Sequence, residues 1–176
     1  MKKKSIIHII TRLMNGGADE NTVFTCNHSV AIGDDVTLLT GQEQNKEILS
    51  KIDNRVRLVV VKDLINEINP IKDLLALFKI KKIINQISPD VVHTHSSKAG
   101  VIGRFAAWLS GTKLIIHTIH TLPFISANFF VKIVYLVVEK ITSFITDEFI
   151  NVSKGTMEIY LKYKIGHSSN HHVIYS

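Results

Sequence analysis

The segment from Pro89 to Arg104, PDVVHTHSSKAGVIGR, changes from strand-forming to helix-forming residues within a few positions. Its first part is a β-branched run that ends in His93, Thr94 and His95. Small residues follow at positions 99, 100, 103, 106 and 107, and they allow a helix to approach a sheet closely. We therefore predict a strand over residues 90–95 and a helix over about 98–110.

The same alternation runs along the rest of the chain. Further strands are predicted over residues 5–11, 35–41, 54–61, 112–120, 147–153 and, as a short last strand, 171–176. Further helices are predicted over residues 18–32, 69–89, 126–145 and 154–165, with Pro70 near the start of the second and Pro89 after its end. Strands that alternate with helices form right-handed βαβ units. The predicted fold is a doubly wound, Rossmann-like α/β domain, with a mostly parallel sheet and helices on both faces.

Composition limits the classes of protein and partner. The chain has 176 residues, of which 45% are hydrophobic and 20% charged, which is enough for one domain with a sizeable core. The net charge of +6 favours acidic partners such as phosphates or an anionic membrane face. Nucleic acid is not expected as a partner, because the lysines are scattered and lack interleaved aromatic residues. The single cysteine, Cys26, excludes an intramolecular disulfide and suits the cytoplasm. The apolar stretch 129–145 carries internal charges and reads as a buried helix rather than a membrane span.

Ligands of an open parallel sheet bind outside the carboxyl ends of its strands, so the residues that follow each strand are the candidates. Four such positions are unusual: Asn15 to Gly17, His95 to Lys98, His120 with Thr121, and Ser153 with Lys154. The amides of Gly16 and Gly17 open a helix and can hold an anion such as a diphosphate, although a tight turn alone also favours glycine. The sequence has no G-x-G-x-x-G, and the second strand ends without an acid, which disfavours a nicotinamide dinucleotide.

The histidines near these strand ends admit several interpretations. His93 and His95 share one side of their strand, yet no carboxylate or thiolate accompanies them in sequence, so no metal is expected. His117 lies within its strand and is predicted to be a core residue, as is His93. His95, at a strand end, is placed to bond a substrate hydroxyl or phosphate. Ser97 is predicted to cap the next helix, and Lys98 at a helix start calls for a bound anion, an acidic partner or solvent.

Four segments, taken in order, resemble a known family. RLMNGGADENT (12–22), PDVVHTHSSKAGVIGR, IIHTIHTLPF (115–124) and HHVIYS (171–176) are similar to the N-terminal domain of retaining glycosyltransferases of family 4. That group has the two-domain GT-B fold and includes enzymes of capsule, lipopolysaccharide and exopolysaccharide assembly. The resemblance implies that Gly16 and Gly17 face the donor diphosphate and that His120 is a catalytic residue beside the transferred sugar. It places His95, Ser96, Ser97 and Lys98 on the acceptor side and calls for no cofactor.

The resemblance also carries expectations about the whole protein. Residues 1–176 correspond to the acceptor-side domain, and the donor domain that grips the nucleotide sugar is absent, so the isolated chain is expected to be inactive. Expected partners are a nucleotide sugar, a sugar or lipid-linked acceptor, and an anionic membrane contacted peripherally through PFISANFF (123–130). This chain departs from the family at Asp19, where glutamate commonly follows GGA. The alternative function is a non-catalytic α/β module that binds a phosphorylated or glycosylated ligand.

Overall fold

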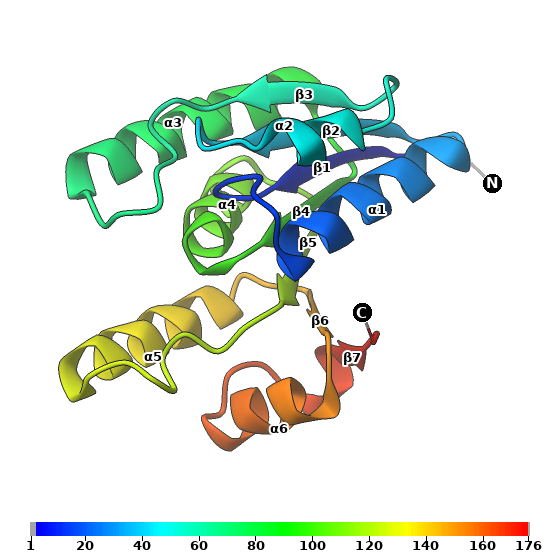
Figure 1. Ribbon diagram of the computed structural model, residues 1–176. Helices are drawn as coiled ribbons and strands as arrows, with labels where there is room; N and C mark the ends of the chain where they lie inside the picture. The colour runs from blue at the N-terminus through cyan, green and yellow to red at the C-terminus, as the bar shows by residue number, and fades with distance from the viewer. Residues whose placement is uncertain (1–2, 176) are drawn as a thin grey trace.

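Seven parallel strands form one sheet at the centre of the molecule, in the order β3-β2-β1-β4-β5-β6-β7. Figure 1 shows the computed structural model, which describes residues 3–175. The strands are β1 (Ser5–Ile9), β2 (Asp35–Thr40), β3 (Arg57–Val60), β4 (Val91–His95), β5 (Leu114–Ile119), β6 (Glu148–Asn151) and β7 (His171–Val173). This order reverses between β1 and β4, which is the place where doubly wound folds bind ligands.

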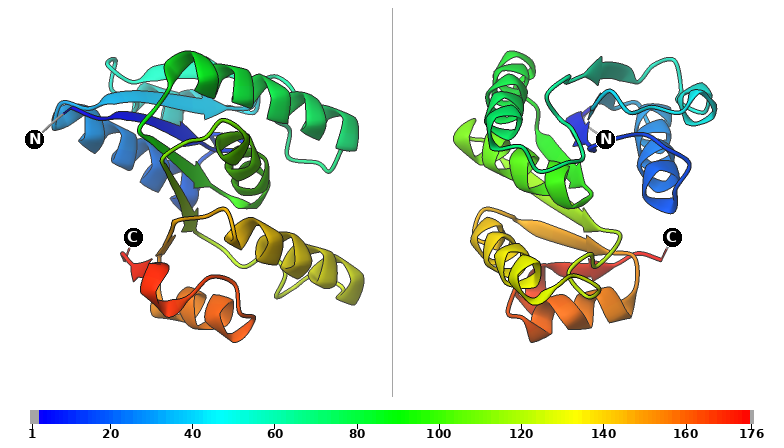
Figure 2. Two further views of the ribbon diagram at one scale, coloured as in Figure 1. Left: turned by 180° about the vertical axis from the view of Figure 1, so that it is seen from behind. Right: turned by 60° about the vertical axis from the view of Figure 1, so that its left-hand side comes forward.

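Within residues 3–175, six α-helices cover the sheet on its two faces, as the right-hand view of Figure 2 shows for α1 to α5. They are α1 (Gly17–Ala31), α2 (Lys46–Ser50), α3 (Pro70–Ile87), α4 (Ser97–Leu109), α5 (Phe129–Ser143) and α6 (Lys154–Lys162), and a short 3-10 helix η1 (Ser168–Asn170) precedes β7. Helices α1 and α2 lie on one face, and α3, α4 and α5 lie on the other. The predicted doubly wound fold is confirmed.

Strand alternation produces a separate core on each face. Ile7 and Ile9 of β1 pack with α3 and α4 in one fully buried cluster. Ile10, after the end of β1, packs with Leu38 of β2 and Val23 of α1 in a second cluster on the opposite face. A third cluster joins β5 and β6 to α6. Since Ile7 and Ile9 flank His8, the alternation turns the side chain of His8 to the face of α1.

Polar side chains define where several helices begin. The side-chain Oδ1 atoms of Asn69 and Asn128 accept hydrogen bonds from backbone amides in the first turns of α3 and α5, and the Oγ atom of Ser153 caps α6 in the same way. Asn128 explains why α5 begins at Phe129 rather than at the predicted residue 126. Helix α2 was not predicted; it has five residues, and the side chain of Asn45 caps it by accepting from the Glu47 amide.

A buried ion pair fastens α4 to α5. The guanidinium Nη2 of Arg104 lies 3.0 Å from both carboxylate oxygens of Glu139, and both side chains are almost fully inaccessible to solvent. Arg104 also donates to the carbonyl of Gly100 and to the hydroxyl of Thr146, so its charge is well satisfied. Within residues 3–175, none of the helices combines the length and the apolar character that crossing a bilayer requires.

Candidate functional site

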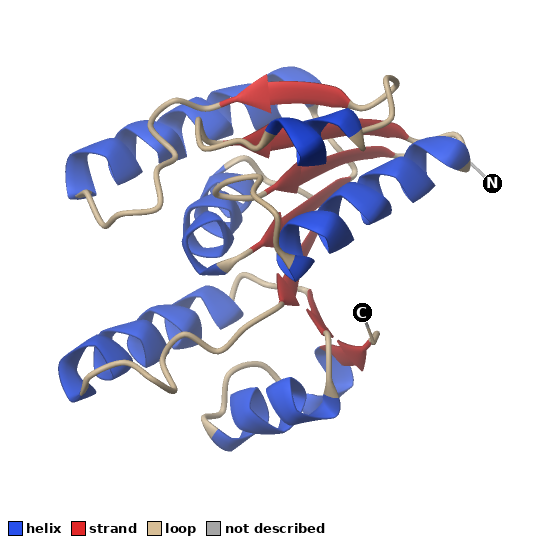
Figure 3. Ribbon diagram, in the orientation of Figure 1, coloured by secondary structure: helices blue, strands red, loops and turns tan. Residues whose placement is uncertain are grey.

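The carboxyl ends of the parallel strands lie at one edge of the sheet (Figure 3), and the predicted site residues lie at strand ends and helix starts along this edge. Gly16 and Gly17 follow β1 and begin α1, and His95 is the last residue of β4. Ser96 is the N-cap residue of α4, and His120 directly follows β5. These residues come from three separate chain segments, and the parallel topology places them at the same edge of the sheet.

The start of α1 leaves room for a ligand. Gly16 has an extended backbone (φ −144°) that any residue adopts, so its conformation does not demand glycine. A Cβ atom built at Gly17 would meet no described atom within 4 Å. The space on the side-chain side of Gly17 is therefore open, at the first residue of α1.

Asp19 stabilises the turn that precedes α1. Its Oδ2 atom accepts a hydrogen bond from the amide of Met14 at 3.0 Å. The carboxyl group is mostly buried, and this burial raises the pKa of Asp19. Asp19 thus stabilises the turn before α1 through this buried hydrogen bond.

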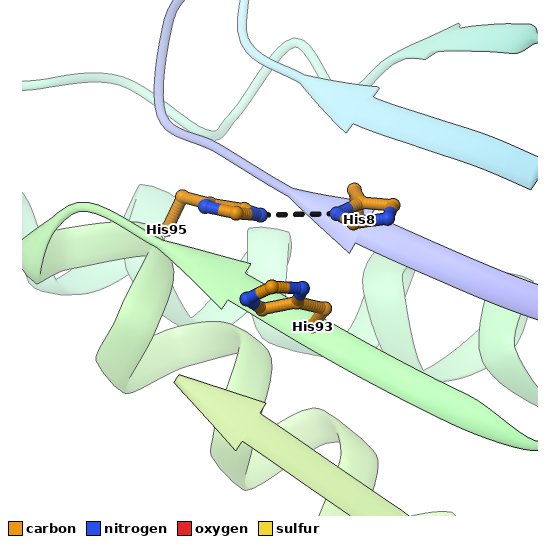
Figure 4. Close-up of side chains that lie close together, drawn as sticks. All are labelled: His8, His93 and His95. Carbon is orange, nitrogen blue, oxygen red and sulfur yellow. Dashed lines mark hydrogen bonds between the residues drawn. The ribbon is translucent and has the colours of Figure 1, made fainter. Parts of the chain in front are cut away.

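Three imidazole rings form a continuous hydrogen-bonded chain from this edge into the sheet. His120 Nε2 lies 3.2 Å from His95 Nδ1, and His95 Nε2 lies 3.0 Å from His8 Nδ1. Figure 4 shows the inner bond and places His93 beside it, on the same face of β4 as His95. His8, His93 and His95 each offer a ring nitrogen within 4.8 Å of the others. No carboxylate or thiolate among residues 3–175 joins this group of three, and the sequence-based expectation of no metal stays a prediction.

These rings are neutral near pH 7 because burial removes the water that would stabilise their charged form. Desolvation lowers the pKa of His8 and of His120 to about 4. Desolvation also holds the pKa of His93 and of His95 well below the ordinary value, and the neighbouring histidines add to the effect. Each ring in the chain therefore carries one N–H and one lone pair.

Two histidines are core residues, as predicted. His93 is buried, and its Nε2 lies 2.7 Å from the hydroxyl of Thr118. His117 is buried on the other face, where its Nδ1 lies 2.9 Å from the hydroxyl of Thr94. A Cβ atom at Gly100 would lie 2.5 Å from the His117 ring, so the small residues of α4 serve close packing, as predicted.

His95 differs from its predicted environment. It is fully buried, and both of its ring nitrogens are already bonded to histidines. A direct bond from His95 to an acceptor would break one of these contacts. The geometry supports an indirect role, in which His95 holds His120.

The loop from β4 into α4 is strained and tightly held. Ser96 has φ +60°, a region that favours glycine, and its hydroxyl lies 3.0 Å from that of Thr11. The Thr11 hydroxyl also accepts a hydrogen bond from the backbone amide of Ala99, at 3.1 Å. The prediction that Ser97 caps α4 is wrong, because Ser96 occupies the N-cap position without a side-chain cap bond. Instead, the Ser97 hydroxyl accepts from the Tyr135 hydroxyl at 3.0 Å.

Lys98 has an acidic partner within the chain. Its Nζ lies 2.7 Å from Asp73 Oδ1 of α3, and it also donates to the carbonyl of Glu67. The sequence left a bound anion, an acidic partner or solvent as alternatives for Lys98. The structure shows the acidic partner, which is Asp73. Ser153, after β6, forms a capping box with Thr156, which accounts for its position by helix capping.

His8, Thr11, Tyr135 and Asp73 were not predicted as site residues. His8 lies within a strand, and its bond to His95 depends on the β1–β4 pairing, in which His8 is the register partner of His93. Strand alternation in the segment SIIHIIT could have signalled that His8 shares a face with the other histidines.

The fold and this edge define a doubly wound α/β domain in which the start of α1 and the strand-end histidines His95 and His120 lie at the same edge of the sheet. Residues 15–176 match the family model described as Glycosyltransferase Family 4. The chain belongs to this family, which confirms the resemblance seen in the sequence.

Individual relatives agree with this assignment. The chain is 37% identical over 112 residues to the UDP-Gal:alpha-D-GlcNAc-diphosphoundecaprenol alpha-1,3-galactosyltransferase of Escherichia coli, covering 63% of this chain and 29% of that protein. It is 26% identical over 152 residues to the capsular polysaccharide biosynthesis glycosyltransferase CapM of Staphylococcus aureus, covering 78% of this chain and 38% of that one. The crystal structure of Anabaena HepE in complex with UDP and glucose superposes with a TM-score of 0.70 at 14% identity, covering 98% of this chain and 44% of that chain, and shows that the fold is shared. The chain thus spans less than half the length of each of these three proteins.

Proposed function

We propose that this chain is the N-terminal, acceptor-side domain of a retaining GT-B glycosyltransferase that transfers a sugar from a nucleotide sugar in cell-surface polysaccharide or glycolipid assembly. The nucleotide sugar is held jointly with a second, donor-binding domain. The observation that carries this proposal is the family match over residues 15–176, combined with the open start of α1 on the edge that also holds His120.

In this proposal, the amides of Gly16 and Gly17 approach the diphosphate of the donor. The open space before Gly17 supports this role, since a leaving diphosphate needs close, preorganised hydrogen-bond donors as its charge develops. His120 is the catalytic residue of this domain and contacts the transferred sugar. Its ring is half-buried and neutral, which suits a hydrogen-bonding role beside a sugar rather than a fixed positive charge.

The β4–α4 loop forms the acceptor side. Ser96 lies in this loop, and Ser97 and Lys98 form the start of α4. His95 acts from beneath the loop by holding His120. Lys98 is only 15% exposed in its side chain and is paired with Asp73, so its charge is oriented before any ligand arrives. The relative from Escherichia coli is named for a diphosphoundecaprenol-linked acceptor, which supports a lipid-linked acceptor here.

A lipid-linked acceptor also supports peripheral contact with the cytoplasmic face of a membrane, and the outer side of α5 fits such contact. An unbroken apolar stripe of exposed side chains runs along this helix at helical spacing: Phe130, Ile133, Val134, Val137, Ile141 and Phe144. Of the segment 123–130, Phe124 is a core residue, whereas Ile125, Phe129 and Phe130 are exposed. Lys132 and Lys140 of α5 contribute positive charge at its flank, beside α6.

The proposal is tested by measuring sugar transfer from UDP-sugars to polyprenyl-diphosphate sugars with a protein that contains this chain and a donor domain. Removing the imidazole in His120→Ala is expected to lower kcat/KM by about 10²-fold or more. His172→Ala, which removes an exposed imidazole on β7, is the matched control and should leave transfer unchanged. Wild-type transfer by His120→Ala would refute the catalytic role.

A non-catalytic binding module is the competing function. It predicts that the same protein binds a phosphorylated or glycosylated ligand without turning it over, whatever donor domain is supplied. Transfer that depends on both parts would exclude this alternative.

A further inference from the structure

The chain of imidazoles from His120 to His8 has a definite direction, and this direction fixes which nitrogen of His120 carries its proton. Each link joins two ring nitrogens at 3.0 to 3.2 Å, and such a link needs one N–H and one lone pair. Because all three rings are neutral, choosing the proton position on one ring determines the other two.

Only two arrangements satisfy both links. In the first, His120 donates from Nε2 to His95, and His95 donates from Nε2 to His8. The proton of His8 then lies on Nε2. In the second, His8 donates from Nδ1 to His95, and His95 donates from Nδ1 to His120. The proton of His120 then lies on Nδ1, and Nε2 of His8 is a bare lone pair.

The buried end of the chain distinguishes these arrangements. His8 Nε2 is inaccessible to solvent and has no hydrogen-bond partner among residues 3–175. The first arrangement would leave an unpaired N–H at this atom, whereas the second leaves an unpaired lone pair. An orphaned buried N–H is rarer in proteins than an under-satisfied acceptor, so the second arrangement is favoured.

The outer end of the chain lies at the proposed transfer site. His120 is half-buried, and its Nε2 is taken by His95. Its Nδ1 bonds to no other group within the described part of the chain and is not among the atoms enclosed without a partner. Nδ1 is therefore the nitrogen that can meet a ligand.

We propose that His8 and His95 are positioning residues that fix His120 as the Nδ1–H tautomer, so that it meets the ligand as a neutral hydrogen-bond donor. Such a donor suits an oxygen of the sugar or of the diphosphate and cannot accept a proton at the same nitrogen. The tautomer follows from the contacts of this chain alone. Its use toward a sugar nucleotide rests on the proposed function.

The test is long-range ¹H–¹⁵N correlation of the imidazole nitrogens in the purified protein at pH 8, which separates protonated from lone-pair nitrogens in each ring. We expect Nδ1 to be protonated and Nε2 to be unprotonated in His8, His95 and His120 alike. The reverse pattern in these three rings would overturn the proposal. So would one equivalent of zinc in the purified protein, because the nitrogens shared by His8 and His95 would then bind metal.

Two substitutions of equal shape test the direction. His8→Asp offers His95 only an acceptor and is expected to move the proton of His120 to Nε2. His8→Asn can still donate and is expected to keep the wild-type pattern. His117→Asn, on the opposite face of the sheet, is the control and should not alter the His120 nitrogens. An unchanged His120 pattern in a folded His8→Asp protein whose His95 carries a single proton would contradict the relay.

Activity then separates this inference from the proposed function. If the tautomers are as expected but His120→Ala transfers sugar at the wild-type rate, the relay stands and its proposed use toward a ligand fails. If His8→Asp reverses the tautomer, its transfer rate should fall toward the roughly 10²-fold loss expected for a removed donor. A wild-type rate in that reversed protein would overturn the donor role.

Discussion

At the carboxyl edge, some residues are small because the fold packs closely there, and others leave space that a ligand can occupy. The glycines show this difference most directly. Gly100 and Gly103 of α4 lie against side chains of the sheet, whereas Gly17 of α1 faces open space. Similar residues at two helices on the same edge therefore have different physical reasons to be small.

Alanine substitutions at these glycines should separate the two roles. Gly103→Ala places a Cβ atom 2.8 Å from Thr94 Cγ2 and is expected to lower the free energy of unfolding by about 1–3 kcal/mol. Gly17→Ala meets nothing and should leave stability unchanged or slightly raised, while it weakens binding of a nucleotide sugar by blocking the approach to the α1 amides. Urea unfolding and calorimetry of UDP-sugar binding by the two-domain protein measure the two effects. Equal nucleotide binding by wild type and Gly17→Ala would argue against a diphosphate at this turn.

The buried histidines make the stability of the chain sensitive to acid. Burial depresses the folded-state pKa of His8 and His120 to about 4 and holds that of His93, His95 and His117 well below 6.5. The unfolded state therefore binds more protons below pH 6.5, and the stability that is fully present above this pH is lost as the pH falls toward 4. Each histidine contributes a slope of up to about 1.4 kcal/mol per pH unit in this window. We expect cooperative unfolding, followed by circular dichroism, between pH 6.5 and 4. An unfolding free energy that stays constant from pH 7.5 to 5 would contradict this expectation.

At the scale of elements, a buried ion pair joins α4 to α5 among otherwise apolar contacts. Arg104 and Glu139 lie in adjacent helices, 35 positions apart, and both are inaccessible to solvent. Removing one partner leaves the other charge buried without compensation, which costs more than removing both.

Glu139→Ala is therefore expected to lower the free energy of unfolding by about 3–5 kcal/mol. The double variant Arg104→Met/Glu139→Leu should recover most of this loss, because neither charge remains in the core. Chemical denaturation of the two variants and the wild type measures the difference. A double variant that is less stable than Glu139→Ala would show that the ion pair contributes more than the cost of its desolvation.

The elements were predictable from the sequence, and the contacts between them were not. The period of two in SIIHIIT and the proline and asparagine at the start of α3 are local signals, so they fixed the type of each element. The five residues of α2 are too few for a periodic pattern, and the start of α5 depended on which of several polar residues served as cap. His8 and Glu139 gain their meaning only from partners that are brought close by strand pairing and helix packing. Similarly, the sequence shows that Lys98 lies at the start of a helix, where the dipole disfavours a positive charge. Its compensation by the Asp73 carboxylate is seen only in the structure.

At the scale of the whole molecule, the distribution of exposed apolar side chains is uneven. Helices α3 and α5 lie on the same side of the sheet and both begin at its carboxyl edge (Figure 1). Beside the stripe on α5, the first turns of α3 expose Ile71, Leu74, Leu75 and Phe78. Exposed apolar side chains gathered on one side of a charged domain are typical of surfaces that contact a membrane or another protein, which agrees with the proposed membrane contact. Since the proposed transfer site lies at the same edge, contact through this side would bring that edge toward membrane-held acceptors.

Vesicle binding tests the role of this surface. The net charge of +6 and the apolar stripe on α5 should together bind the protein to vesicles that contain anionic phospholipid, and added salt should weaken this binding because it screens the charge. Each large side chain transferred from water into the interface contributes about 1.5–3 kcal/mol, so Phe130→Asp should weaken co-sedimentation by about tenfold or more without affecting the fold, since this side chain is 79% exposed. Phe24→Asp is the matched control, because Phe24 is 71% exposed but lies on α1, across the sheet from α5. If both variants bind vesicles as the wild type does, α5 is not the contact surface. If Phe24→Asp alone loses binding, the membrane contact lies on the opposite face of the sheet, and the proposed role of α5 in this contact is refuted.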